Sequence, residues 1–233
     1  MVNHSVYIIM PVKDSPQTTE EAIRAIIKSG HTLCVYNDFS KPENAAILDR
    51  LHDELGFKLI HMSELTDHPS PNYRMVLMDA QRACLSNGNH LVIIESDVVI
   101  RSNTIQRLEE AVRPGVGMIA AVTTDEDGQV NFPYEYARNY REDEACRKRL
   151  SFCCTLLTNE LLQAYDFSRL DEKKNWYDVT ISHLSMQMGL ENLLLVSNPV
   201  LHRPHSSRPW KRLKYTHPLL YYWRKLTQGR DKI

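Results

Sequence analysis

The feature of this 233-residue sequence that most constrains its fold is the alternation of short apolar runs with amphipathic segments in the first half. Continuous apolar runs are typical of strands buried on both faces, and the segments between them have apolar residues at helical spacing. A repeated strand–helix–strand order favours a parallel, doubly wound sheet with right-handed crossovers. The predicted strands are Val6–Met10, Leu33–Tyr36, Phe57–His61 and Leu91–Ile94, and the predicted helices are Pro16–Lys28, Pro42–Leu55 and Asn72–Leu85.

The second half has a less regular pattern. A turn signal at Asp127-Gly128 suits a hairpin, and residues 134–149 form a polar stretch that fits either a lid over a bound ligand or a solvated insertion. The predicted strands are Met118–Val122, Leu150–Leu157 and Leu193–Leu201, and helices are predicted from Asn159 and over Asp178–Met188. No linker is evident between the halves, so we expect one α/β domain over residues 1–207.

Residues 208–233 form a basic, aromatic tail. The net charge of -1 hides an asymmetry. Residues 203–233 carry nine Lys/Arg and one acidic residue, whereas the other 202 residues carry 19 Lys/Arg and 28 acidic residues. Such a tail favours an anionic partner, either a membrane surface or a lipid-linked acceptor. A solvated tail whose aromatic residues pack on the domain is the alternative. No nucleic-acid partner is expected, because no RNA- or DNA-binding signature accompanies the charge.

The five cysteines show no C-x-x-C pattern, and their odd number fits free thiols in a reducing compartment. The first residues lack the pattern of a secretory signal peptide. We therefore expect a cytoplasmic protein whose tail allows peripheral contact with the inner face of the membrane.

Glycine is scarce, and no glycine-rich phosphate-binding motif occurs among the eight glycines. Acidic residues instead follow two predicted strands, at Asp38 and at Glu95-Ser96-Asp97. In open α/β sheets, ligands bind beyond the carboxyl ends of the strands. Either these acids cap helices or lie in loops, or they hold Mg²⁺ or Mn²⁺ against a diphosphate in place of a glycine-rich cradle.

Several segments together resemble family 2 glycosyltransferases, in that family's order and over roughly residues 5–207. Residues 7–14 (Y-I-I-M-P-V-K-D) resemble the opening strand, residues 35–40 (V-Y-N-D-F-S) the V-D-D-G-S motif, and residues 88–97 the G-x-Y-I-x-F-L-D-x-D segment. Asp166-Phe167 with residues 176–182 resembles the G-F-D…E-D-V-D-L-S segment, and Val200-Leu201-His202 resembles the closing strand. The resemblance implies a GT-A fold, with a nucleotide-binding half (1–100) and an acceptor half (101–207).

The resemblance also implies an inverting, metal-dependent transfer of sugar from a nucleotide-sugar, expected to be UDP-linked, to a hydroxyl of a saccharide or lipid-linked acceptor. Asp97 and His202 would bind the metal, although a histidine at such a strand end can also be structural. Nucleotide contacts would come from Pro11, Lys13, Asp38, Arg74, Glu95 and Ser96.

Asp178 would be the general base that takes the proton of the acceptor hydroxyl. Capping of the following helix is its alternative role, and the two are compatible. Glu95 stands where the family usually has aspartate, and Tyr177 and Thr180 replace two acids around Asp178.

Two other functions fit parts of this pattern. A sugar-phosphate nucleotidyltransferase is disfavoured, because such enzymes usually open with a glycine-rich loop and residues 11–16 contain no glycine. The departures at Glu95, Tyr177 and Thr180 also allow an inactive transferase-like module that binds a membrane or a partner.

Overall fold

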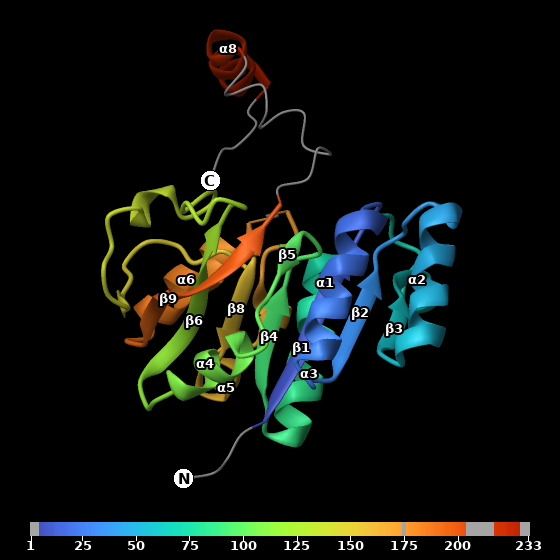
Figure 1. The fold of residues 1–233 in the computed structure, drawn as a ribbon, viewed down its shortest axis with the longest axis horizontal. Coiled ribbons are helices and arrows are strands. Elements are labelled where there is room, and N and C mark those ends of the chain that lie inside the picture. The colour runs from blue at the N-terminus through green and yellow to red at the C-terminus, as the bar shows by residue number, and fades with distance from the viewer. Residues whose placement is uncertain (1–4, 174–175, 204–216, 229–233) are drawn as a thin grey trace. The chain divides into compact units, whose positions relative to one another are not determined.

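The structure, a computed structural model, describes residues 5–173, 176–203 and 217–228. The chain divides into two compact units, Met1–Arg203 and Pro204–Ile233. The described part of the first unit contains a nine-stranded sheet in the order β3-β2-β1-β4-β8-β6-β9-β5, with β7 paired to β9 (Figure 1).

The first half of the sheet is parallel, as the sequence predicts. Strand β1 pairs in parallel with β2 and β4, and β2 pairs in parallel with β3. Its elements are β1 (Val6–Val12), α1 (Pro16–Lys28), β2 (Leu33–Asn37), α2 (Pro42–Leu55), β3 (Lys58–His61), η1 (Met62–Glu64), α3 (Tyr73–Asn87) and β4 (His90–Ile94). Proline suits the first turn of α1 and α2, and Gly56 and Gly88 end α2 and α3 in the left-handed conformation.

The second half is mixed. Strand β8 runs antiparallel to both of its neighbours, β4 and β6, while β6 and β9 are parallel. Its elements are β5 (Val98–Val99), α4 (Thr104–Glu110), β6 (Val116–Thr124), η2 (Glu135–Ala137), β7 (Glu144–Ala145), β8 (Cys154–Leu157), α5 (Asn159–Ala164), η3 (Phe167–Arg169), α6 (Tyr177–Gln187) and β9 (Glu191–His202).

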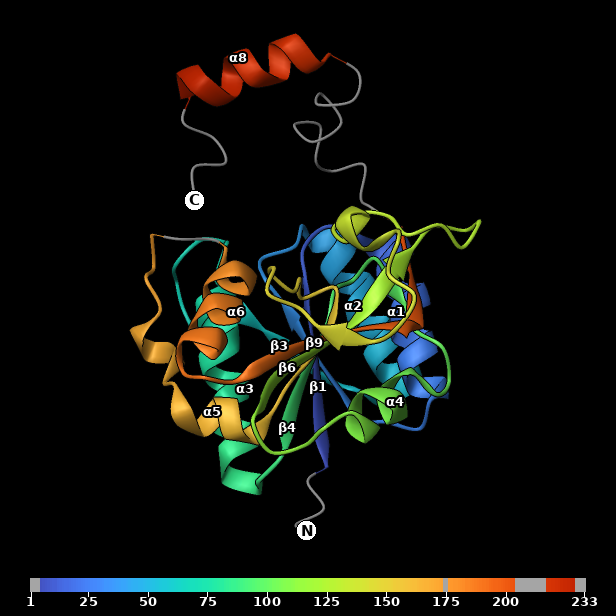
Figure 2. The same cartoon turned by 90° about the vertical axis from the view of Figure 1, so that its left-hand side faces the viewer.

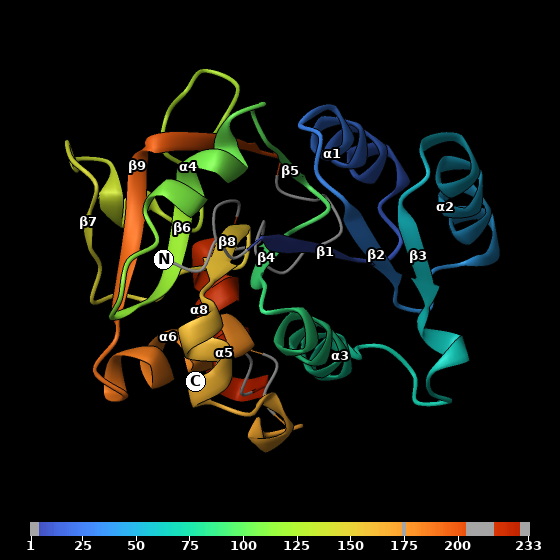
Figure 3. The ribbon, with the colours of Figure 1, turned by 90° about the horizontal axis from the view of Figure 1, so that it is seen from below.

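Helices cover both faces of the sheet, with α1, α2 and α4 on one face and α3, α5 and α6 on the other (Figures 2 and 3). Each face has its own hydrophobic core. Ile8 and Met10 of β1 belong to the core under α1, α2 and α4, whereas Ile9 between them belongs to the core under α3, α5 and α6. A strand buried on both faces needs this continuous apolar run. The predicted doubly wound, mainly parallel sheet flanked by helices is confirmed.

Three local expectations differ from the structure. The predicted strand Leu150–Leu157 is regular only over β8, because the amides of Leu150 and Ser151 donate to the side chains of Ser182 and Tyr134 instead of to a strand. The predicted loop 134–149 contains η2 and the short strand β7. Helix α4 and strand β5 were not expected, since 7 and 2 residues are too few to show a period.

The described part of the second unit is the helix α8 (Pro218–Gln228). Residues 208–216 and 229–233 of the predicted tail lie outside the described residues. Among the helices that the structure describes, none combines the length and the apolar character that crossing a membrane requires.

Candidate active site

The topology brings the ends of several strands to one edge of the sheet. Strands β1, β2 and β4 end there, and β9 ends there too, because it is parallel to β6 and two antiparallel pairings link β6 to β4. Strand β8 runs the other way and begins there. Asp38, Glu95 and His202 at strand ends and Cys153 before β8 therefore lie at this edge.

Asp97 and His202 form a buried pair at this edge. The two side chains are 8% and 4% exposed, and His202 Nε2 lies 3.5 Å from Asp97 Oδ2. Strand β5 pairs Val98 with His202, and the Arg203 amide donates to the Asp97 carbonyl, so the backbone holds the two residues together. Because Nδ1 of His202 lies 2.6 Å from the carbonyl oxygen of Phe132, which can only accept, Nδ1 carries a proton. In the neutral ring, Nε2 then presents its lone pair toward Asp97.

Glu95 and Cys153 lie beside this pair. Ligand atoms of Glu95, Cys153 and His202 are all within 4.8 Å of one another. The Cys153 thiol donates to Glu95 Oε2 at 3.3 Å, and the Glu95 amide donates to the Cys153 carbonyl. Burial, together with the nearby Glu95 carboxylate, raises the pKa of the Cys153 thiol well above its ordinary value. Cys153 is therefore a neutral donor to Glu95.

The donor set of this edge suits a hard or borderline divalent cation. Carboxylates and neutral imidazole are ligands that Mn²⁺ accepts, whereas a protonated thiol is not a metal ligand. The Phe132 carbonyl orients His202 through its other ring nitrogen, as is usual for a metal-binding histidine. Asp97, His202 and Glu95 are thus the residues that could hold Mn²⁺ or Mg²⁺, and Cys153, whose Sγ lies within the same 4.8 Å group as Glu95 and His202, would join them only by losing its proton on metal binding.

Asp178 lies in the first turn of α6, where the helix dipole favours a negative charge. It is the second residue of the helix, and the N-cap is Trp176, so capping does not explain its position. Its side chain is 17% exposed, and its Oδ2 lies 3.6 Å from Nη1 of Arg149. A carboxylate that is partly exposed and held beside a guanidinium can accept a proton from a ligand hydroxyl.

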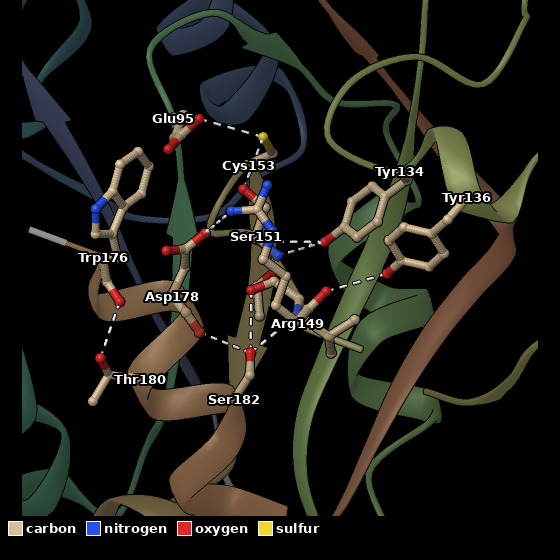
Figure 4. Close-up of polar contacts among 12 residues, drawn as sticks. Glu95, Tyr134, Tyr136, Arg149, Ser151, Cys153, Trp176, Asp178, Thr180 and Ser182 are labelled. Carbon is tan, nitrogen blue, oxygen red and sulfur yellow. Dashed lines mark hydrogen bonds and ion pairs between the residues drawn. The ribbon is translucent and has the colours of Figure 1, made fainter. Parts of the chain in front are cut away.

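The segment from Arg149 to Cys153 links Asp178 on α6 to the acidic residues at the sheet edge. Arg149 at one end contacts Asp178, and Cys153 at the other end contacts Glu95 (Figure 4). Ser182 fixes this segment to α6, because its hydroxyl accepts from the Leu150 amide and donates to the Asp178 carbonyl. Figure 4 shows Asp178 and Glu95 on the same side of the segment, with the indole of Trp176 beside them.

Two tyrosines from the 134–149 stretch hold the other side of this segment. The Tyr134 hydroxyl accepts from the Ser151 amide at 2.9 Å, and the Tyr136 hydroxyl donates to the Arg149 carbonyl at 3.1 Å (Figure 4). Tyr134 is 1% exposed, so the contact is part of the core. The stretch therefore supports the backbone at the site.

Asp38 is at the predicted edge, and its carboxylate has protein partners. It accepts hydrogen bonds from the Ser70 hydroxyl, the Asn72 amide and the Asn72 side chain at 2.7–3.0 Å. These contacts fix the segment that leads into α3. A role in binding a nucleotide remains a prediction for Asp38.

The other predicted nucleotide contacts come from β1 and the residues after it, from the segment after β4 and from α3. Pro11 is half-buried in β1, Lys13 is exposed just after it, and Ser96 is buried between Glu95 and Asp97. Arg74 lies in the first turn of α3 and donates to the Glu172 carboxylate and the Ser168 carbonyl. Its contacts tie α3 to the segment before α6, and its predicted contact with a nucleotide is untested.

Sequence reasoning missed Arg149 and Cys153. The sequence pattern places Arg149 in a polar loop and indicates only a free thiol for Cys153. Their partners are 29 residues away at Asp178 and 58 residues away at Glu95, so only the folded chain reveals the contacts. The one sequence feature that marks this position is the pair of adjacent cysteines, Cys153 and Cys154, at the start of an apolar run.

Comparisons with known proteins show the fold. No protein-family model and no curated protein sequence matches the chain. A structure of glucosyl-3-phosphoglycerate synthase from Mycobacterium tuberculosis, in complex with Mn²⁺, UDP-glucose and phosphoglyceric acid, superposes with a TM-score of 0.56 at 13% identity, covering 88% of this chain and 74% of that one. A structure of GalNAc-T7 with UDP, GalNAc and Mn²⁺ superposes with a TM-score of 0.55 at 13% identity, covering 94% of this chain and 50% of that one.

A197 from STIV is also similar, with a TM-score of 0.54 at 11% identity and coverage of 86% of each chain. Identities this low show similarity of fold. The GT-A-like fold that the sequence predicts is therefore confirmed, and membership of family 2 remains a prediction.

Proposed function

We propose that this chain is a metal-dependent, inverting glycosyltransferase that moves a sugar from a nucleotide-sugar to an acceptor hydroxyl. The observation that carries this proposal is the convergence of Glu95, Asp97 and His202 at the sheet edge, with Asp178 at the other end of the segment 149–153. The solved structures with this fold include two whose complexes contain Mn²⁺ and a uridine diphosphate group, which supports a UDP-sugar donor.

The residues of the site have distinct proposed roles. A divalent ion held by Asp97, His202 and Glu95 would supply positive charge to the departing diphosphate. Asp178 accepts the proton of the acceptor hydroxyl as that oxygen attacks the anomeric carbon, so no covalent sugar–enzyme intermediate is needed. Arg149 positions the Asp178 carboxylate. The acceptor would be a saccharide or a lipid-linked saccharide, which places the reaction in polysaccharide or glycolipid synthesis.

The donor is the part of this proposal that can be tested without knowing the acceptor. Nucleotide-sugars are incubated with the protein and Mn²⁺, and slow hydrolysis of the donor is measured. We expect hydrolysis of a UDP-sugar that stops when the metal is chelated. Release of pyrophosphate from UTP with a sugar phosphate would indicate a nucleotidyltransferase, and complete inactivity with every donor would favour a binding module.

The base is tested by Asp178→Asn. General-base catalysis contributes about 10²–10⁴-fold, so hydrolysis or transfer should fall by that factor while UDP binding is unchanged. The matched control is Asp171→Asn, which removes the same charge from an exposed position just before α6 and should leave the rate unaltered. A wild-type rate in Asp178→Asn would show that another group takes the proton.

A further inference from the structure

The helix α8 has an apolar stripe that is exposed. Leu219, Tyr222 and Trp223 occupy positions i, i+3 and i+4, which lie on one face of a helix. Their side chains are 87%, 52% and 61% exposed. Large apolar groups gathered on one exposed face mark an interaction surface, whereas single exposed apolar residues do not.

The chain around this stripe is strongly basic. Residues 204–233 contain eight Lys/Arg and one acidic residue, Asp231. Four of the cations, at 208, 211, 212 and 214, precede the stripe, and the other four, at 224, 225, 230 and 232, follow it. The stripe carries leucine, tyrosine and tryptophan, and positive charges precede and follow it in the sequence. This combination is complementary to a surface whose outer layer is anionic and whose next layer is apolar.

We propose that α8 docks the protein on the surface of an anionic lipid bilayer. Leu219, Tyr222 and Trp223 enter the boundary between head groups and acyl chains, where the amphipathic rings of tyrosine and tryptophan are stable. The positive charge that the sequence carries on both sides of the stripe attracts the anionic head groups. The helix has 11 residues, which suits a position in the plane of the interface rather than across the bilayer.

The partner is an anionic bilayer rather than a nucleic acid, because the stripe supplies apolar area that phosphate contacts do not use. A second copy of the chain is also disfavoured, because two tails of the same charge would repel each other. This inference stands apart from the proposed transferase activity, since it depends on the second unit alone.

The test is flotation of the intact chain with vesicles of phosphatidylcholine and of phosphatidylcholine mixed with phosphatidylglycerol. We expect binding to the mixed vesicles only, and weaker binding at high salt because screening reduces the attraction. The double variant Leu219→Ser/Trp223→Ser should lose at least about tenfold in binding, because it removes two inserted side chains. The control Leu65→Ser/Leu85→Ser changes two exposed leucines of the first unit and should bind like the wild type.

Several outcomes would overturn the proposal. The intact chain could float with neither kind of vesicle or equally with both. The Leu219→Ser/Trp223→Ser variant could also float as well as the wild type. Binding of single-stranded RNA in place of vesicles would also overturn it, as would a stripe-dependent dimer that does not bind lipid. Vesicle binding needs no sugar donor, so its failure would leave the proposed transferase intact, and donor hydrolysis can fail while vesicle binding succeeds.

Discussion

The carboxylate of Asp38 accepts hydrogen bonds from three donors that belong to Ser70 and Asn72. Both Asp38 and Asn72 are buried, so removal of the carboxylate would leave buried donors without a partner. We expect Asp38→Ala to lower the free energy of unfolding by about 2–4 kcal/mol, measured by urea denaturation.

A suitable control for this prediction is Asp49→Ala. Asp49 is 54% exposed and pairs with His61, so its loss should cost less than about 1 kcal/mol. Equal, small losses in the two variants would mean that Asp38 contributes little to the fold and is available for a ligand.

At the scale of elements, Gly117 in β6 marks a close approach between that strand and α6. A Cβ atom at this position would lie 2.1 Å from Ser185 Oγ of α6. Ser185 Oγ donates a hydrogen bond to Asn192 Oδ1 of β9 at 2.7 Å, so the hydroxyl cannot move away from the added Cβ without losing that hydrogen bond. Gly117→Ala should therefore cost about 1–3 kcal/mol of stability.

A double-mutant cycle isolates this clash. Ser185→Ala removes the Oγ atom, so the additional cost of Gly117→Ala should become smaller in that background. Thermal or urea unfolding of the four proteins measures the coupling energy. Additive costs would show that β6 and α6 are not in the close contact that the structure indicates.

The elements also show how far the sequence predicts the fold. Helices α1 and α2 were predicted with their observed bounds, because proline and glycine mark their ends and apolar residues repeat at helical spacing. The direction of β8 could not be predicted, since an apolar run reads the same in either direction. The Arg149–Asp178 and Cys153–Glu95 contacts depend on that reversal, which places the start of β8 beside the end of β4.

At the scale of the whole molecule, the candidate site exists only in the folded first unit. Its side chains extend in sequence from Glu95 to His202 and come from the ends of β4 and β9, the start of α6 and the segment before β8. The predicted strand-end acids were enough to suggest a metal site. They could not reveal that Phe132 orients His202, because that contact joins residues 70 apart.

The proposed transfer requires that Asp97 and His202, with Glu95, hold a divalent ion against the diphosphate of a nucleotide. Calorimetric titration of UDP in the presence and absence of Mn²⁺ tests this claim most directly, with wild type, Asp97→Ala and the control Asp49→Ala compared after thermal melts confirm that each is folded. We predict binding by wild type and Asp49→Ala only when Mn²⁺ is present, and a loss of at least about tenfold in Asp97→Ala. Equal UDP affinity with and without Mn²⁺, or unchanged affinity in Asp97→Ala, would show that these residues do not hold a metal ion that binds the diphosphate.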